Sequence, residues 1–385
     1  MEAPLVLELK NIHKRFENIH ALNGVNFDLR QGETHAVVGE NGAGKSTLMR
    51  ILAGIYTEYE GEYLLAGQPL HLQSPRDALS RGIGMIHQEL SVMPELSVAE
   101  NVFLGRQLTN RFGAVDWRRM NRIAEEELHK LGFEHIDVRA PLGNYSLGTQ
   151  QVVEVLRVIL SGARVLIMDE PTTALSPAEI ERLIQLIDTL RQNNRSIIYI
   201  SHFLDEVMRV ADRVTVLRDG QKVSTLNAAD TDVHNLISLI LGREINAALP
   251  AVTAQTDGHT LLEVRDLAAD VFTGINLKVQ QGEVVGLYGA IGAGHFDLAR
   301  AIFGMYRYDS GTITVDGKTF PRSFSARYAI ENGLAYATES RRKSLFMDEA
   351  IYRNVMMPHL QRVGRVLTPQ PARELQLAQP QITLT

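Results

Sequence analysis

The sequence contains no cysteine, a single tryptophan and no excess of positive charge. Without cysteine the chain cannot form a disulfide framework, a thiolate zinc site or a cysteine nucleophile. Its 39 Lys and Arg residues against 45 Asp and Glu residues give a net charge of -6. This balance excludes a strongly basic protein that binds by neutralising phosphates, so we expect no nucleic acid among the partners.

Long apolar runs are also missing. No uninterrupted stretch approaches the roughly 20 residues that span a bilayer, and Glu2 near the start argues against a secretory signal. The sequence thus predicts a soluble, intracellular protein whose connection to any membrane runs through a partner. With 45% hydrophobic and 22% charged residues the composition is that of a globular protein, and a length of 385 residues suggests two or three domains.

An internal repeat organises the chain. Residues 32–39 (GETHAVVG) return as residues 282–289 (GEVVGLYG), 250 positions later. The same offset relates Gly44 to Gly294, Gly54 to Gly304, Gly61 to Gly311 and Gly67 to Gly317, and it becomes 251 between Gly82 and Gly333. Paired glycines in one register indicate a tandem duplication.

The second copy is incomplete, because counterparts of residues 145–217 would fall beyond Thr385. We expect a first domain over residues 1–245, a linker over 246–259, a partial second copy over 260–366 and a loose tail over 367–385. The tail assignment rests on Pro369, Pro371 and Pro380 among glutamines. Without the later strands of its own sheet, the second copy is expected to fold poorly.

Strand-like and helix-like segments alternate in the first copy. Residues 34–38, 165–168 and 197–200 are continuous apolar or β-branched runs, as in parallel strands buried on both faces, and residues 150–160 and 178–190 alternate with them as helices. This alternation predicts an α/β domain with a parallel sheet.

A glycine-rich motif follows the first of these strands. Its residues are Gly39, Glu40, Asn41, Gly42, Ala43, Gly44, Lys45, Ser46 and Thr47, and the first eight fit G-x-x-x-x-G-K-[ST]. The glycines let backbone N–H groups close on β- and γ-phosphate oxygens. A helix beginning at Gly44 or Lys45, with Leu48, Ile51 and Leu52 buried, would add its positive dipole end. Lys45 would reach the β/γ-phosphates and Ser46 would bind Mg²⁺. A chance glycine turn is the alternative, and the strand–helix context favours the phosphate loop.

Further polar residues follow the later strands. Asp169 and Glu170 come after the strand at 165–168, where a carboxylate could hold Mg²⁺ (Asp169) and orient or deprotonate the attacking water (Glu170). Taken alone, such a pair is more often a turn. Likewise His202 could be a structural histidine, Gln88 a surface amide and Phe16 a core residue. Their order and spacing favour function.

That order resembles the ATP-binding-cassette (ABC) superfamily. The matching motifs are Phe16 (adenine-stacking loop), residues 39–47 (Walker A), Gln88 (Q-loop), residues 146–150 (signature), 165–170 (Walker B), 173–176 (D-loop) and 201–202 (switch). The duplication, residues 88–92 (QELSV) and residues 338–342 (TESRR) look like the fused tandem-cassette ATPase subunits of monosaccharide importers.

The resemblance implies a P-loop NTPase fold with a mostly parallel sheet, a helical subdomain at about residues 89–160 and an antiparallel β subdomain, tandemly repeated. It implies ATP and Mg²⁺ as ligands. Glu170, His202 and Gln88 would then be catalytic, and Ser46, Gln88 and Asp169 would hold the metal. The nucleotide would contact Phe16, residues 39–47 and, from an opposing cassette, Ser146 and Gly148 near its γ-phosphate.

The resemblance also implies partners and a location. Two cassettes would close head to tail, the second being a homodimer mate or another chain. Closure and hydrolysis would drive integral membrane permease subunits, coupled through the segment after Gln88. A periplasmic sugar-binding protein would be an indirect partner that helps to choose the sugar. The chain would lie peripherally on the cytoplasmic face of the inner membrane.

The sequence departs from this family in both copies. In the second, His295 and Phe296 replace Lys45 and Ser46, Glu339 replaces the Q-loop glutamine and no aromatic matches Phe16, so this copy is not expected to turn over ATP. In the first, Leu147 and Thr149 depart from the usual signature and Ser176 from the D-loop aspartate.

Three interpretations follow from these departures: a sugar-importer ATPase with a truncated second copy, a nucleotide-binding remnant without transport activity, or an ABC protein acting on ribosomes or DNA. The third is disfavoured, because the sequence lacks a basic patch and a second competent cassette.

Overall fold

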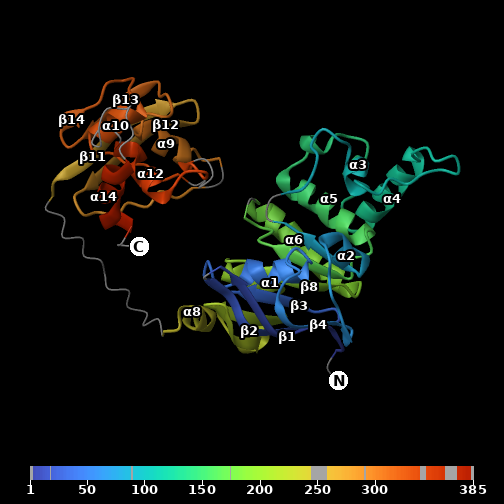
Figure 1. Cartoon of the computed structure of the whole chain (residues 1–385). Coiled ribbons are helices and arrows are strands. Elements are labelled where there is room, and N and C mark those ends of the chain that lie inside the picture. The colour runs from blue at the N-terminus through green and yellow to red at the C-terminus, as the bar shows by residue number, and fades with distance from the viewer. Residues whose placement is uncertain are drawn as a thin grey trace. The chain divides into compact units, whose positions relative to one another are not determined.

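The computed structural model describes residues 3–17, 19–87, 90–173, 175–243, 258–289, 292–338, 344–359 and 371–382. The chain divides into two compact units, Met1–Leu249 (unit 1) and Pro250–Thr385 (unit 2) (Figure 1). Of the expected linker over 246–259, only the last two residues are among those described.

A six-stranded sheet forms the centre of unit 1. Its order is β10-β9-β3-β8-β7-β6, with β3 (Thr34–Val38), β6 (Ile83–Ile86), β7 (Val165–Asp169), β8 (Ser196–Ile200) and β9 (Arg213–Arg218) parallel and β10 (Gln221–Asn227) antiparallel. The three strands predicted from apolar runs are β3, β7 and β8, so these predictions and the parallel sheet are confirmed. Because strands this apolar bury both faces, they need a cover on each side.

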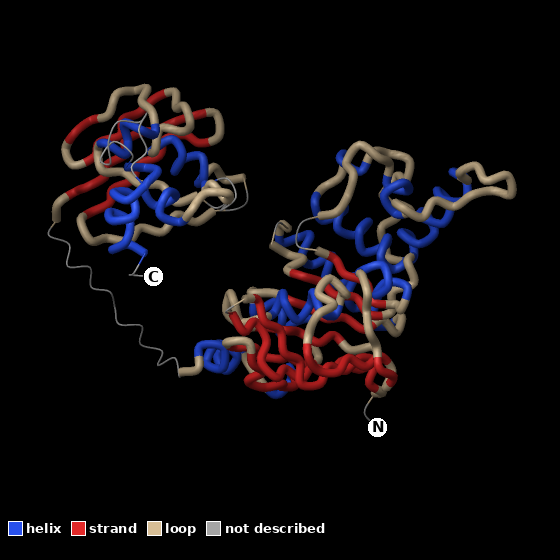
Figure 2. The backbone as a smooth tube through the Cα atoms, viewed as in Figure 1, coloured by secondary structure: helices blue, strands red, loops and turns tan. Residues whose placement is uncertain are grey.

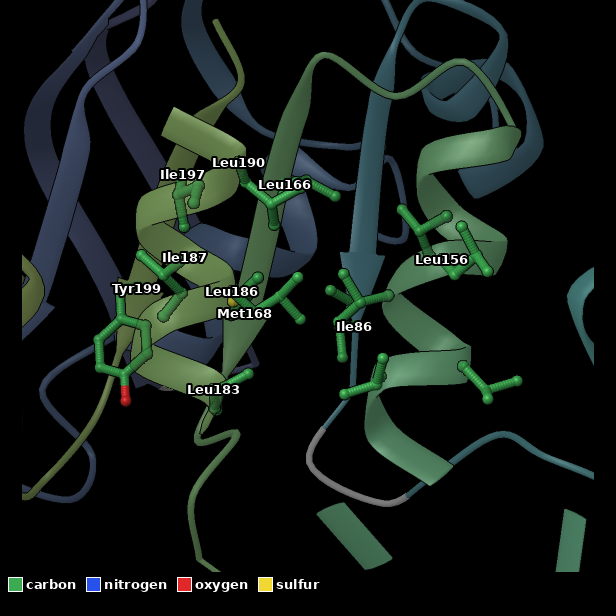
Figure 3. Close-up of a cluster of buried hydrophobic side chains, with 14 of the residues drawn as sticks. Ile86, Leu156, Leu166, Met168, Leu183, Leu186, Ile187, Leu190, Ile197 and Tyr199 are labelled. Carbon is green, nitrogen blue, oxygen red and sulfur yellow. The ribbon is translucent and has the colours of Figure 1, made fainter. Parts of the chain in front are cut away.

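Two apolar clusters supply those covers. Consecutive residues of one strand, such as Ile167 and Met168, point to opposite faces and belong to different clusters. The larger cluster packs α5 (Leu147–Leu160) and α6 (Pro177–Gln192) against one face, and Figure 3 shows Leu156 of α5 near Ile86 and Leu183, Leu186, Ile187 and Leu190 of α6 over β7 and β8. The second cluster packs α1 (Lys45–Leu52) on the other face.

An antiparallel sheet adjoins the second cluster. Its order is β2-β1-β4-β5, formed by β1 (Leu5–Phe16), β2 (Ile19–Arg30), β4 (Glu60–Leu65) and β5 (Gln68–Pro69). The remaining helices of unit 1 are α2 (Pro75–Ser80), α3 (Val98–Val102), α4 (Trp117–Lys130), η1 (Leu142–Asn144), α7 (Leu204–Val210), η2 (Ala228–Asp230) and α8 (Val233–Leu241). Helices α3, α4 and α5 gather on the side of unit 1 that faces away from the antiparallel sheet (Figure 2).

A buried polar network joins strands β2, β3 and β9. The Arg213 guanidinium donates to Glu33 and to Asp28, each at 2.6 Å, and approaches His35 Nδ1 at 3.3 Å. The other ring nitrogen of His35 lies 2.7 Å from the Thr215 hydroxyl. Burial, reinforced by the charge of Arg213, lowers the pKa of His35 to about 3. The folded protein therefore holds this histidine neutral near pH 7.

Unit 2 repeats the antiparallel part of unit 1. Its sheet has the equivalent order β12-β11-β13-β14, formed by β11 (Thr260–Ala269), β12 (Phe272–Gln280), β13 (Ser310–Val315) and β14 (Lys318–Thr319). The helices are α9 (His295–Ile302), α10 (Ala326–Glu331), α12 (Ile351–Met356) and η3 (Met357–His359), followed by α14 (Pro371–Ile382). A separate apolar cluster, which includes Leu267, Leu298 and Ile313, forms its core.

The parallel part of the repeat is different. Residues 283–289, the counterpart of β3, belong to no strand, and Val284 is 92% exposed where its counterpart Thr34 is fully buried. The sequence predicts a poorly folded second copy. In the structure, the antiparallel sheet and α9 of the second copy do form. The counterpart of β3 forms no strand, so the prediction holds for that segment and not for that sheet and helix.

The C-terminal segment differs from the loose tail expected over residues 367–385. Residues Pro371–Ile382 form helix α14, with Pro380 near its end, and Ala378 packs against Met356 of α12. Pro371 suits the first helical position, because an N–H there would have no partner within the helix, whereas Pro380 removes one backbone donor from the last turn. Residues 360–370 and 383–385 lie outside those described.

The repeat extends further than the paired glycines indicate. The Asn101 side chain accepts from the Met93 N–H at 2.8 Å and donates to nearby carbonyls, closing a turn before α3. Asn354, 253 residues later, makes the same bonds at the turn before α12. Its side-chain oxygen accepts from the Phe346 N–H at 2.8 Å. Its side-chain nitrogen donates to the carbonyls of Phe346 at 3.0 Å, Glu349 at 3.3 Å and Ala350 at 3.4 Å. Both copies therefore contain this asparagine-clamped turn.

Candidate nucleotide site

The glycine-rich loop leads from β3 into α1, as the motif requires. Gly42 and Gly44 have φ values of 88° and 101°, in the region that favours glycine. A Cβ on Gly39 would lie 2.2 Å from the Leu217 carbonyl oxygen, and one on Gly44 would lie 2.6 Å from that of Ala21. The loop is therefore held close against the backbone of β9 and β2, and only glycine fits at these positions.

Lys45 begins α1 and is folded back over the loop. Its Nζ donates to the Gly39 carbonyl at 2.8 Å and to the Glu40 carbonyl at 2.9 Å. Burial lowers the pKa of Lys45, while the carboxylates of Glu170 and Asp169 raise it. The predicted helix start is confirmed, with Leu48, Ile51 and Leu52 buried. Ser46 is exposed and Thr47 half-buried at the same helix end.

Two carboxylates lie at the carboxyl end of β7. Asp169 is its last residue, and burial together with the neighbouring Glu170 raises the pKa of Asp169. Glu170 adopts a φ of 48°, and its N–H donates to the Ile200 carbonyl at 2.9 Å. Non-glycine residues rarely adopt this conformation, and such local strain is common at functional sites.

His202 joins this group from the neighbouring strand. It follows β8, and its Nδ1 lies 3.5 Å from Glu170 Oε2. The structure therefore brings together Lys45, Asp169, Glu170 and His202, at the end of the parallel sheet where nucleotides bind in open α/β folds. Gln88 lies outside the described residues, but His87 is close enough to lower the pKa of Asp169.

Phe16 lies at the exposed end of β1. Its ring is 38% exposed and contacts Tyr56 edge-on, with centroids 5.2 Å apart. Lys14 Nζ lies 5.1 Å from the Phe16 ring centroid. The exposed part of the ring is open to a planar ligand, and stacking on a base stays a prediction.

Ser146 and Gly148 form a second group at the start of α5. Ser146 is the N-cap of this helix, and its hydroxyl accepts from the Thr149 N–H. The Gly148 N–H donates to the carboxylate of Glu179, on α6, at 3.0 Å. Sequence reasoning missed Glu179. Its signal is the spacing Ser176–Glu179, the S-x-x-E of a capping box, which the structure contains.

The corresponding loop of unit 2 keeps its turn and loses its chemistry. Gly292 and Gly294 have φ values of 85° and 82°, close to those in unit 1, and α9 follows. His295 stands at the lysine position with its ring beside that of Phe296, 4.3 Å between centroids. Phenylalanine offers Mg²⁺ no oxygen ligand. Glu339 lies outside the described residues.

Known proteins are similar to this chain in sequence. A sequence model of the ABC transporter family matches residues 22–173 and 272–381. The chain is 39% identical over 356 residues to the ribose import ATP-binding protein RbsA of Bacillus licheniformis, covering 92% of this chain and 72% of that protein. It is 43% identical over 375 residues to ribose import ATP-binding protein RbsA 2 of Rubrobacter xylanophilus, covering 96% and 72%.

Solved structures agree on the fold. The ADP conformation of MJ1267, an ATP-binding cassette of an ABC transporter, superposes with a TM-score of 0.55 at 22% identity, over 62% of this chain and 99% of that one. CbiO1 of Clostridium perfringens gives a TM-score of 0.53 at 25% identity, over 64% and 96%. The predicted fold class is confirmed, and with matches to both copies and relatives of this identity the chain belongs to the ABC transporter family.

Proposed function

We propose that this chain is an ATP-binding and ATP-hydrolysing subunit that powers import of a sugar through a membrane ABC transporter. The observation that carries the proposal is the grouping of Lys45, Asp169, Glu170 and His202 around a glycine-rich loop in unit 1. Relatives named ribose import ATP-binding proteins support the transport role, and the match covers 72% of each of them.

Unit 1 suits ATP and Mg²⁺. Gly39 and Gly44 let the loop lie close against the backbone of β9 and β2, and its N–H groups and Lys45 suit phosphate oxygens. Ser46 and Asp169 offer the oxygen ligands that Mg²⁺ prefers, and Gln88 would complete them. When bound, the metal would neutralise charge on the β- and γ-phosphates. Phe16 would stack on the adenine.

Hydrolysis needs a proton acceptor beside the attacking water. Glu170 is held at the end of β7 and can orient that water or take its proton, and His202 lies next to it. In this arrangement His202 positions Glu170. Lys45 would exchange its bonds to the Gly39 and Glu40 carbonyls for bonds to the phosphates, so its buried ammonium would have hydrogen-bond partners before and after ATP binds.

A complete site requires a second cassette. Ser146 and Gly148 would meet the γ-phosphate of an ATP held by the opposing cassette, which a second copy of unit 1 or another chain can provide. Unit 2 lacks the lysine and the hydroxyl of the loop, so unit 1 is the part of the described chain suited to hydrolysis.

Permease subunits would dock on a groove of unit 1. It has a volume of about 510 Å³ and is lined by Ile55, Arg76, Met85, His87, Leu104 and Arg106, among others. Arg157 ties the segment after Gln88 to α5, donating to the Ser91 carbonyl at 2.6 Å and to Glu154 at 2.9 Å. A partner in this groove could thus move His87 and Gln88.

No helix among the described residues is long and apolar enough to cross a bilayer. With permease subunits as partners, the chain would lie peripherally on the cytoplasmic face of the inner membrane. A periplasmic sugar-binding protein would be an indirect partner.

Steady-state ATPase activity, measured against protein concentration with Lys45→Ala as control, tests the proposal. A rate per chain that rises with concentration means that unit 1 completes its site by self-association. Binding without turnover means that another chain must supply the second cassette. Sugar uptake into vesicles that contain the permease subunits then tests the transport role. Nucleotide affinity that survives Lys45→Ala would refute the site.

A further inference from the structure

The carboxylate of Glu179 occupies the donors of the signature segment. It accepts from the Gly148 N–H at 3.0 Å, and its interaction with the nearby Ser146 hydroxyl lowers its pKa. Its second oxygen accepts from the N–H and hydroxyl of Ser176, at 2.9 and 2.8 Å. One anion therefore joins the start of α5, the signature, to the start of α6, the D-loop.

The close approach depends on the glycine. A Cβ on Gly148 would lie 2.7 Å from Glu179 Cγ and 2.8 Å from Glu179 Oε1, so a larger residue would push the carboxylate away. The contact also fits the electrostatics. The interaction with the Ser146 hydroxyl, the largest cause, together with the Ser176 and Gly148 bonds, lowers the pKa of Glu179 to about 2 despite partial burial. The group is therefore ionised throughout the neutral range.

Carboxylate and phosphate oxygens use the same donors. A hydroxyl and an N–H at a helix start suit an anion, and Ser146 and Gly148 are the groups that the proposed function assigns to the γ-phosphate of an opposing ATP. We infer that Glu179 is an internal stand-in for that phosphate, which holds the signature donors in the nucleotide-free chain and must release them before the two cassettes close. This inference rests on the proposed function for its role, and on the contacts of Glu179 for its geometry.

Two consequences follow from such a stand-in. In the free chain it prevents other anions from binding the signature segment and keeps the Ser146 and Gly148 donors satisfied. On closure it competes with the γ-phosphate, so removing its charge should favour the closed state. Because Ser176 shares the same carboxylate, release would also free the D-loop at the start of α6. Glu179 is therefore a positioning residue that sets how readily ATP closes the site.

Hydrogen exchange of residues 146–152 tests the contact without nucleotide. Glu179→Ala should speed exchange at the Gly148 amide by about tenfold, and added inorganic phosphate should restore protection. Glu179→Gln, which keeps an accepting oxygen, should lie between. Glu181→Gln is the matched control: it removes a carboxylate from the same helix whose partner is Arg209, at 2.8 and 2.6 Å, and should change nothing here.

Three outcomes decide the inference. Unchanged exchange in Glu179→Ala refutes the contact. Faster exchange that phosphate does not restore shows a helix cap only and overturns the stand-in role. Restored protection by phosphate supports it, provided that exchange within residues 183–190 of α6 stays at the wild-type rate, which shows that the helix remains folded.

A nucleotide arm tests the competition. In a Glu170→Gln background, adding Glu179→Gln should lower the MgATP concentration that half-protects residues 146–152 by about three- to tenfold, whereas adding Glu181→Gln should not. An equal ATP requirement in both double variants overturns the competition. Failure of ATP to protect residues 39–47 in any variant would refute the proposed function instead, and the phosphate arm would still decide whether Glu179 stands in for an anion.

Discussion

The same sequence pattern folds differently in the two units, and the difference separates local from long-range structure. Val37 and Val38 of β3 are fully buried between β8 and β9, whereas Leu287 and Tyr288, 250 residues on, are 46% and fully exposed. The glycine turn and the helix after it nevertheless recur, with α9 beginning 250 residues after α1. A turn and a helix need only neighbours in sequence, while a parallel strand needs partners from distant segments.

The antiparallel sheet supports the same view. In both units this sheet is complete within one part of the copy, residues 5–69 and 260–319, and β2-β1-β4-β5 recurs as β12-β11-β13-β14. The strands that would flank 283–289 correspond to β8 and β9, which the described part of unit 2 does not contain. The described part of unit 2 thus contains an antiparallel sheet whose strands all lie within residues 260–319, and the residues suited to the nucleotide chemistry lie in unit 1.

The largest expected effect on ATP binding contrasts Lys45 with His295. Lys45→Ala removes the cation from the loop of unit 1 and should weaken ATP binding by about a hundredfold or more, effectively abolishing it. His295→Ala should leave affinity unchanged. Equilibrium binding of a fluorescent ATP analogue to the full chain measures both. Should His295→Ala also lose affinity, unit 2 would contribute to a nucleotide site and the contrast would break.

Glu170 should separate binding from hydrolysis. Glu170→Gln keeps the shape of the side chain but removes its proton acceptor, so turnover should fall by about a hundred- to ten-thousandfold while ATP stays bound. Single-turnover phosphate release, with the affinity measured alongside, checks the split. Turnover at the wild-type rate in Glu170→Gln would mean that another group takes the proton.

Stability should show how differently the two loops are packed. Gly39→Ala drives a Cβ against the Leu217 carbonyl and should destabilise unit 1 by about 2–4 kcal/mol. At Gly289 the nearest atom is the Ala293 Cβ, at 3.0 Å, and alanine should cost less than about 1 kcal/mol. Urea unfolding followed by Trp117, the single tryptophan, reports unit 1, and hydrogen exchange in α9 reports unit 2. Equal losses would contradict the packing difference.

Much of this arrangement could be predicted from the sequence, and the limits have physical causes. Strands β3, β7 and β8 are apolar enough to identify, and the glycine motif fixes the start of α1. Helix α5 starts at Leu147, three residues earlier than the predicted 150, because Ser146 caps it. The C-terminal helix α14 was not predicted, because its sequence contains two prolines. The effect of a proline depends on its position along the helix, and Pro371 stands at the first position.

The site was predicted less completely than the fold. The residues at strand ends could be placed, because parallel strands bring their carboxyl ends to one edge. The bond between Glu179 and Gly148 could not, since it joins two helices through residues 31 positions apart, although the capping-box spacing marks Glu179 itself. The buried position of His35 was equally hidden, because its partners Arg213 and Thr215 are 178 and 180 residues away.

A smaller effect should follow from His35, which the second copy replaces with Val285. Its pKa is about 3 in the folded chain against 6.5 in the unfolded chain, so the unfolded chain binds an extra proton between these values. The stability of unit 1 should therefore fall with pH below 6.5, by about 1.4 kcal/mol per pH unit from this residue. His35→Val should cost about 1–2 kcal/mol at pH 7 and lack that part of the slope.

Urea unfolding at pH 7, 6 and 5, followed by Trp117, measures the difference in slope. The charged groups that face His35 are Asp28, Glu33, Arg213 and Lys222, and all are present in both proteins, so their titration largely cancels. The gap between wild type and variant should close as the pH falls. A constant gap would mean that His35 binds its proton equally in the folded and unfolded chains.

The smallest expected effect concerns the hairpin tip that carries Phe16. Asn11 and Asp266 make equivalent N–H bonds, to Asn26 and Asn276. From these residues to the loop contacts of Ala21 and Val271 there are ten positions in unit 1 and five in unit 2, so the second hairpin is shorter and has no counterpart of Phe16.

Phe16→Ala should therefore weaken ATP binding by about three- to tenfold, because only stacking on the base is lost. Binding of inorganic tripolyphosphate, which has no base, should stay unchanged, and Val271→Ala in unit 2 is the matched control. Titration calorimetry with both ligands distinguishes the cases. If tripolyphosphate also bound more weakly, Phe16 would act by supporting the phosphate loop rather than by stacking. The shorter hairpin of unit 2 would then be a second reason, besides His295, to expect no nucleotide binding at its loop.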